Sequence, residues 1–184
     1  VGPTQDPWRP TGKVLAYTGF EPGRDGFFFF NYSNVGSSLP NRMNKYVFGG
    51  NYSNVKNLGS QQMINLFGRR NVCAGHKKGK SNSCVLTLGA KAWMESVNRV
   101  SSGGHCFGIA TNAAQLFNRQ LSQAQFGGRS TTHSIPFKPA STRPIAQAFS
   151  LQTLATSPTL QPRSAVKLLK RNLRPGHVPF TLSM

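Results

Sequence analysis

The chain has 184 residues, a length that suits one domain with a sizeable core. It carries 22 Lys and Arg against four acidic residues, so its net charge is +18 although only 14% of residues are charged, below the roughly 25% usual in globular domains. Such an acid-depleted surface attracts polyanions, but it does not by itself identify a nucleic-acid reader. No apolar run approaches the length of a membrane span, and no signal peptide is visible, as in a mature secreted product.

Residues 1–26 contain four prolines and are expected to form an extended N-terminal segment, with a short strand at Val14–Tyr17. The apolar run Phe27–Phe30 follows and predicts a strand or an extended stretch laid on the core. The pentapeptide Asn-Tyr-Ser-Asn-Val occurs at 31–35 and again at 51–55. Both copies favour turns, although each also holds a glycosylation sequon that matters only in a glycosylating secretory pathway.

The stretch Ser60–Phe67 predicts a short helix. Ser60 can cap it, its apolar residues recur at helical spacing, and Gly68 can end it. A cluster of basic residues begins directly after this helix, where cations suit the dipole. These candidate anion-binding residues are Arg69, Arg70, Lys77, Lys78 and Lys80.

Two cysteines, Cys73 and Cys84, bracket a stretch rich in Gly, Ser, Asn and Lys, which predicts a loop closed by a disulfide. In an oxidising compartment this pairing leaves Cys106 as the odd thiol, whereas in the cytosol all three cysteines would be reduced. His76 lies in the same loop, but the spacing matches no common zinc pattern. We expect neither a metal site nor a cofactor.

A second helix is predicted over residues 88–100, capped by Thr87 and carrying an apolar stripe that includes Trp93 and Val97. After a turn at residues 101–104, a third helix runs from Cys106 to about Leu121. The pair Gly103-Gly104 lies where its N-cap is expected.

Cys106 would then lie in the first turn of a helix, where free backbone N–H groups and the macrodipole favour an anion. A thiolate is such an anion, so this position favours a nucleophilic sulfur. The alternative is a buried cysteine that merely opens a core helix.

The C-terminal third begins with a Gly-, Ser-, Thr- and Pro-rich stretch at 127–144 that predicts a long loop containing His133. Residues 145–154 suit a short helix or an extended segment. A basic amphipathic helix is predicted from Pro162 to Leu173, and a strand from Val178 to Met184. The basic face of this helix (Lys167, Lys170, Arg171, Arg174) suits solvent or an anionic partner.

The segment Gly104–Ile109 resembles the nucleophile segment of papain-like cysteine peptidases, in which the cysteine begins the central helix. Further short stretches resemble a group of largely uncharacterised secreted bacterial proteins expected to share that fold. They are Phe30–Asn34, Leu66–Gly68, Val72–Ala74, Cys84–Thr87, Trp93-Met94, Gly104–Cys106 and Phe149–Leu154.

The resemblance implies a papain-like α+β fold in a single domain of residues 1–184. A helical part at 27–126 would surround the helix of Cys106, and residues 145–184 would hold the final helix and the first strand of a short or truncated sheet. It also implies a catalytic His and a side-chain amide donor for the oxyanion hole. We take His133 and Asn98 as candidates, although Asn98 lies eight residues before the cysteine and the papain-like pattern has a Gln six before. The base could instead be His177, or lie beyond Met184 if the chain is the N-terminal part of a longer protein.

Three functions stay open. The first is a secreted papain-like cysteine hydrolase, a peptidase or amidase that uses Cys106 on a peptide or amide substrate. The second is a basic protein that binds nucleic acid, an anionic wall polymer or a membrane surface. The third is a catalytically inactive papain-like module with a structural role.

Overall fold

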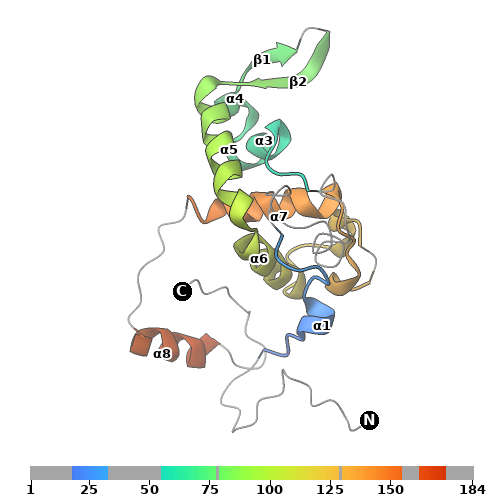
Figure 1. Ribbon diagram of the computed structural model, residues 1–184, viewed down its shortest axis with the longest axis vertical. Helices are drawn as coiled ribbons and strands as arrows, with labels where there is room; N and C mark the ends of the chain where they lie inside the picture. The colour runs from blue at the N-terminus through green and yellow to red at the C-terminus, as the bar shows by residue number, and fades with distance from the viewer. Residues whose placement is uncertain (1–17, 33–54, 78, 129, 155–161, 173–184) are drawn as a thin grey trace.

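The computed structural model describes residues 18–32, 55–77, 79–128, 130–154 and 162–172 (Figure 1). These residues form a mixed α+β structure that is mostly helical and has one two-stranded sheet, so the predicted α+β class is confirmed. None of the described helices combines the length and apolar character needed to cross a membrane. The predicted strands at Val14–Tyr17 and Val178–Met184 lie outside the described residues, as do Lys78 and His177.

The first part of the described chain is more regular than expected. A short helix, α1, spans Pro22–Asp25 in the segment predicted to be extended, because Pro22 presets the first helical φ and the Asp25 carboxylate accepts the Glu21 N–H at 2.8 Å. Phe27–Phe30 forms no strand, and the chain bends at Phe28 and Phe29, so that Phe29 is buried in the core while Phe30 is exposed.

Helix α3 spans Ser60–Phe67 as predicted, and Gly68 ends it with a φ of 81°. The N-cap is Gly59 rather than Ser60. The Gly59 N–H donates to Gln62 Oε1 at 3.1 Å, so the N-cap lies one residue earlier than predicted. Arg69–Val72 then forms the single turn α4.

The stretch predicted as a loop between the cysteines is a β-hairpin. Strands β1 (Cys73–Lys77) and β2 (Lys80–Leu86) pair antiparallel, with Cys73 opposite Leu86 and Lys77 opposite Lys80. The predicted disulfide between Cys73 and Cys84 is present, with the Cα atoms 5.3 Å apart, at the base of this hairpin. Backbone hydrogen bonds make the ladder, so the polar side chains that suggested a loop do not oppose it.

Helix α5 spans Leu88–Val100, and the Thr87 hydroxyl accepts the Ala90 N–H at 3.2 Å as predicted. A 3₁₀ turn, η2 (Ser101–Gly103), leads to helix α6, which spans Cys106–Phe117 and so ends before the expected Leu121. Its N-cap is His105, not the glycine pair.

The predicted loop at 127–144 contains a 3₁₀ turn and the start of a helix, and that helix continues through residues 145–151, where a short helix or an extended segment was predicted. Two 3₁₀ turns, η3 (Gln123–Phe126) and η4 (Thr132–Ser134), precede helix α7, which spans Pro139–Leu151. The Ser, Thr and Pro residues that suggested a loop instead cap and begin these turns, as when the Thr131 hydroxyl accepts the Ser134 N–H at 3.2 Å. Helix α8 spans Pro162–Asn172.

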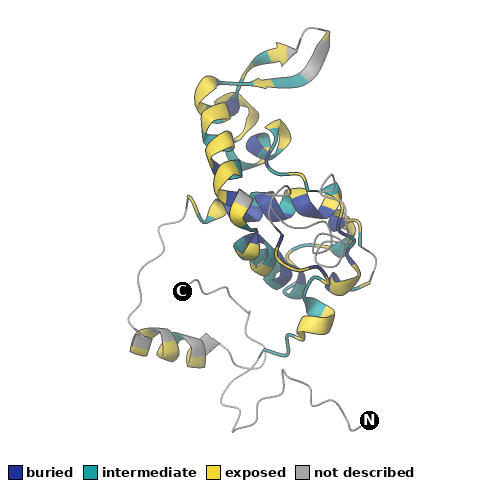
Figure 2. Cartoon of the chain, viewed as in Figure 1, coloured by how far each residue is buried: buried dark blue, intermediate teal, exposed yellow. Residues whose placement is uncertain are grey.

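The core forms where α6 crosses α7, and both helices present buried residues there (Figure 2). Gly108 of α6 lies directly against the Ile145 carbonyl of α7, so no side chain could be accommodated at this crossing. The Asn112 amide strengthens the contact by donating to the carbonyls of Gly108 at 3.0 Å and Pro144 at 3.2 Å. This close crossing fixes the direction of α6 and therefore the position of its first residue, Cys106.

Candidate active site at the start of helix α6

Cys106 is the first residue of α6 and is exposed as a free thiol. The first helical bond runs from the Ile109 N–H to the His105 carbonyl at 3.0 Å, so the N–H groups of Cys106, Phe107 and Gly108 have no partner within the helix. Such N–H groups and the positive end of the helix dipole attract negative charge. The arrangement therefore favours an oxyanion formed beside the Cys106 sulfur.

His105, which precedes Cys106, is buried and held at three points. Its backbone N–H donates to Asn31 Oδ1 at 2.7 Å, its Nδ1 lies 2.9 Å from the Tyr32 carbonyl, and its Nε2 lies 3.0 Å from Asn57 Oδ1. The ring also stacks on the Tyr32 ring. These contacts come from two segments far away in the sequence, so they fix the chain that leads into the nucleophile.

The protonation state of His105 follows from its burial. Burial lowers the pKa of His105, although the Tyr32 carbonyl works against this shift by accepting a hydrogen bond. The neutral ring has one N–H to donate, and the Tyr32 carbonyl can only accept it. As placed, Asn57 Oδ1 faces Nε2 and Asn57 Nδ2 donates to the Ser101 hydroxyl at 3.4 Å, so turning the amide to give Nε2 a donor would replace that bond. His105 is thus committed to structure rather than to proton transfer at Cys106.

Gly104 gives the segment its direction. Its φ of 151° lies in a region that L residues rarely adopt, and a Cβ placed there would lie 2.7 Å from Asn31 Nδ2. The Asn31 amide therefore lies against the Gly104 backbone while its oxygen holds the next N–H. Two residues before Cys106, only a glycine fits both the φ and the space.

Asn98, the predicted amide donor, makes a different interaction. Its Oδ1 accepts the Leu58 N–H at 3.1 Å and its Nδ2 donates to the Leu58 carbonyl at 3.0 Å. This pair ties the last turn of α5 to the segment before α3. The structure therefore places both ends of the Asn98 amide on Leu58.

His133, the predicted base, lies in η4 and is exposed beside the Phe28 ring, with the ring centroids 6.2 Å apart. Its neighbour Thr132 lines a cavity together with Leu116 and Arg119 at the C-terminal end of α6. Leu116 is ten residues along the helix from Cys106, about 15 Å at 1.5 Å per residue. Within the described residues, no hydrogen bond joins the His133 imidazole to the Cys106 thiol.

Four of the predicted anion-binding residues (Arg69, Arg70, Lys77 and Lys80) lie on and beside the β1–β2 hairpin, and Lys78 is outside the described residues. An Arg69 guanidinium nitrogen donates to the Ser83 carbonyl of β2 at 3.3 Å, and Arg70 is exposed on α4. Lys77 and Lys80 flank the hairpin turn, where they are register partners. Figure 1 shows the hairpin extending away from the helical body. Across the described ranges, no group of His, Cys, Asp and Glu side chains is arranged to hold a metal ion.

Sequence reasoning missed the three residues that hold the approach to Cys106: Asn31, Tyr32 and Asn57. Asn31 and Tyr32 belong to the first copy of the repeated pentapeptide, which predicted only a turn. The signal that could have found Asn31 and Tyr32 is the Asn-Tyr pair directly after the run of four phenylalanines.

Comparison with known proteins adds no family. The chain matches no protein-family model, no curated protein and no solved structure.

Proposed function

We propose that the chain is a secreted papain-like cysteine hydrolase that cleaves peptide or amide bonds with Cys106 as its nucleophile. The observation that carries the proposal is the exposed, free Cys106 thiol at the first residue of α6, after a segment immobilised by buried contacts at His105. The other two cysteines are used in a disulfide. That disulfide suits an oxidising compartment and supports the secreted location.

The proposed reaction follows from the groups at this helix end. The Cys106 thiolate attacks the carbonyl carbon, and the oxygen gains negative charge beside the free N–H groups of the first turn. The C–N bond then breaks, the amine leaves with a proton from the general acid, and a thioester remains on sulfur. Water attacks the thioester, the C–S bond breaks, and the acid product and the thiol are released.

A general base is the second group that the proposed reaction needs. His133 is our candidate, and its place near the far end of α6 means that it would have to act in a rearranged state or on a substrate that bridges the two sites. A His133→Ala variant tests the assignment, because loss of the base should lower the hydrolysis rate without changing the melting temperature.

The nucleophile is tested with a peptidyl electrophile, an acyloxymethyl ketone, followed by mass spectrometry of the modified peptide. We expect one adduct, on Cys106, that forms on the folded protein near neutral pH and is absent from Cys106→Ser. An adduct that appears only after unfolding would mark a core cysteine. Labelling of folded Cys106 with no turnover of any peptide or amide would favour a catalytically inactive papain-like module.

A second candidate function, polyanion binding, is favoured by the β1–β2 hairpin. The stretch from Arg69 to Leu86 contains five Lys or Arg residues and no acidic residue, and the disulfide clamps its base. Because neutralised phosphates release counterions, binding should weaken steeply with salt. Changing Lys77, Lys78 and Lys80 to Gln should flatten the salt slope for a single-stranded oligonucleotide. The matched change of Lys167, Lys170 and Arg171 in α8 to Gln should leave that slope unaltered.

A further inference from the structure

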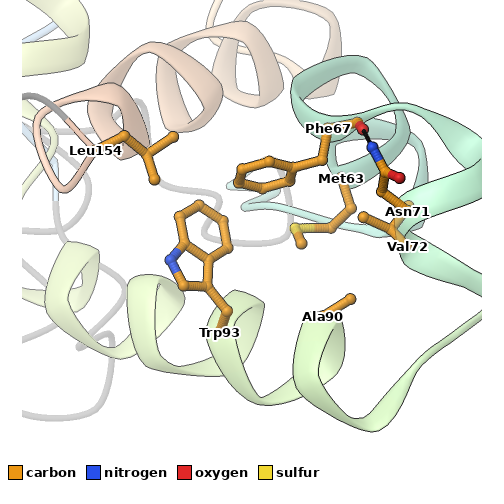
Figure 3. Close-up of a pocket in the computed structure, with 7 residues that line it drawn as sticks. All are labelled: Met63, Phe67, Asn71, Val72, Ala90, Trp93 and Leu154. Atoms are coloured by element: carbon orange, nitrogen blue, oxygen red, sulfur yellow. Dashed lines mark hydrogen bonds between the residues drawn. The ribbon is translucent and has the colours of Figure 1, made fainter.

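An apolar groove opens between α3, α4, α5 and the end of α7 (Figure 3), with a volume of about 320 Å³. Six apolar side chains and one amide line it: Met63, Phe67, Val72, Ala90, Trp93, Leu154 and Asn71. The Phe67 and Trp93 rings meet edge to face, with centroids 4.9 Å apart. The groove is thus an ordered aromatic surface with one side open.

The rim of this groove continues onto the end of α7. Leu154 is 48% exposed and Leu151 is 41% exposed, whereas Met63 at the base of the groove is 1% exposed. The only polar side chain in the lining, Asn71, donates to the Phe67 carbonyl at 2.7 Å. The groove therefore offers contact area rather than polar recognition, as grooves that receive an amphipathic helix do.

Helix α8 is amphipathic and stands apart from the other described helices. Four of the five residues at 165–169 are apolar (Ala165, Val166, Leu168 and Leu169). Lys167 lies between them, and Lys170 and Arg171 follow. Val166 is 50% exposed, and α8 stands clear of the other helices in Figure 1. An isolated helix of 11 residues is only marginally stable in water, and this one has no acidic residue in its first turn.

The groove and this helix are neighbours along the chain. Leu154 lines the groove and Pro162 begins α8, so seven residues separate the two. Eight Cα steps span at most about 28 Å when fully extended, enough for α8 to return over the groove. A tether this short also gives a high effective concentration, of the order of millimolar, so weak apolar contacts suffice.

We propose that the groove is the docking site for α8 of the same chain, which lays its apolar face on Trp93, Phe67 and Leu154. The helix is about 16 Å long, and its Lys and Arg side chains remain in solvent when the apolar face is down. Docking buries Val166 and Leu168 together with Leu151, the last residue of α7, and Leu154 just beyond it. This inference does not depend on the hydrolase proposal, because it involves neither Cys106 nor the residues around His105.

The first test uses Trp93 fluorescence in a Trp8→Phe background, so that Trp93 is the only tryptophan. Leu168→Asp should shift the Trp93 emission to longer wavelength and lower the melting temperature by a few degrees. Lys170→Gln makes the same change in charge on the other side of the helix and should leave both unchanged. Equal emission in the two variants would overturn the proposal.

A second measurement tests the proposal even if Leu168→Asp fails to fold, and it distinguishes docking of α8 within one chain from docking on a second copy or a membrane. A dansyl group on Lys167→Cys, on the exposed side of α8 and in a Cys106→Ser and Trp8→Phe background, should receive energy from Trp93 with an efficiency independent of protein concentration. Transfer that rises with concentration would indicate docking on a second copy. Transfer that is weak without lipid, together with α8 binding to phosphatidylglycerol vesicles, would indicate a membrane-surface helix. Either result contradicts the proposal.

Discussion

The His105 imidazole stacks on the Tyr32 ring, with centroids 4.4 Å apart and planes inclined by 21°. The stack joins the segment at 27–32 to the residue before Cys106, and the Tyr32 carbonyl holds the His105 ring at Nδ1. Tyr32 is fully buried, and burial raises the pKa of its hydroxyl, which has no hydrogen-bond partner among the described residues. The start of α6 is thus fastened to the aromatic core by a pair of neutral rings.

Acid should weaken the packing of His105 against the aromatic core and so lower the free energy of unfolding. Burial holds the folded-state pKa of His105 below its ordinary value of 6.5, so between those two values the unfolded chain binds more protons than the folded protein. The free energy of unfolding should therefore be fully present above about pH 6.5 and decline as the pH falls toward the folded-state pKa. Urea denaturation from pH 7.5 to pH 5 measures the decline.

The control for this pH dependence is His105→Gln, which replaces the titrating ring by an amide that does not titrate. The variant should be less stable at pH 7.5 and should have a flatter stability profile below pH 6.5. A profile as steep as that of the unaltered protein would assign the acid sensitivity to another group.

The conformation of Gly104 gives a second prediction. Gly104→Ala should lower the free energy of unfolding by about 1–3 kcal/mol, because the φ of 151° is strained for alanine and the new Cβ would press on the Asn31 amide. Gly103→Ala is the matched control, since a Cβ there meets nothing within 4 Å, and its effect should stay within about 0.5 kcal/mol. Equal destabilisation by both changes would contradict the role of Gly104.

A third prediction separates a structural from a catalytic role for Asn98. Asn98→Ala removes both hydrogen bonds to the Leu58 backbone and should cost about 1–3 kcal/mol of stability, measured by urea denaturation. Alkylation of Cys106 in the folded variant should be unchanged. Asn65→Ala, at an exposed amide, serves as the control. If Asn98 were an oxyanion donor, hydrolysis would instead fall by about 10²–10³-fold while stability changed little.

The disulfide gives a fourth prediction. Replacing Cys73 and Cys84 by Ser should lower the stability of the domain by about 2–3 kcal/mol, because the bridge closes a loop of about a dozen residues in the unfolded chain. The unreduced protein should react with one equivalent of a thiol reagent, at Cys106. Reductant should lower the melting temperature of Cys106→Ser as much as that of the unaltered protein. Three titratable thiols in an air-oxidised sample would contradict both the bridge and the secreted location.

Features set by neighbouring residues were predicted well from the sequence. The bounds of α3 and α5 and the start of α6 at Cys106 were predicted because helical periodicity and end signals such as Thr87 act within one turn. The disulfide followed from the spacing of two cysteines around a polar stretch. Even the errors at the caps, Gly59 for Ser60 and His105 for the glycine pair, amount to one or two residues.

Pairings between distant segments were not predictable in this way. The hairpin between Cys73 and Leu86 forms through backbone hydrogen bonds, which side-chain composition does not reveal, and the sequence suggested a loop. Helix α7 was predicted only in part, because residues 145–154 suited a short helix or an extended segment while residues 139–144 were assigned to a loop. The Ser, Thr and Pro residues of that first part suit a loop unless α6 is there to bury Ile145 and Phe149. Propensity is a weak guide wherever tertiary burial decides.

At the candidate site, the sequence alone singled out Cys106, because a cysteine at the start of a helix can be recognised from its neighbouring residues. The tertiary structure decided what surrounds it. Asn98 is hydrogen-bonded to Leu58, and His133 lies beside Phe28. The partners of His105 are Asn31, Tyr32 and Asn57. The bonds to His105 cross between 48 and 74 residues of chain, and only the packed core brings their partners within 3 Å.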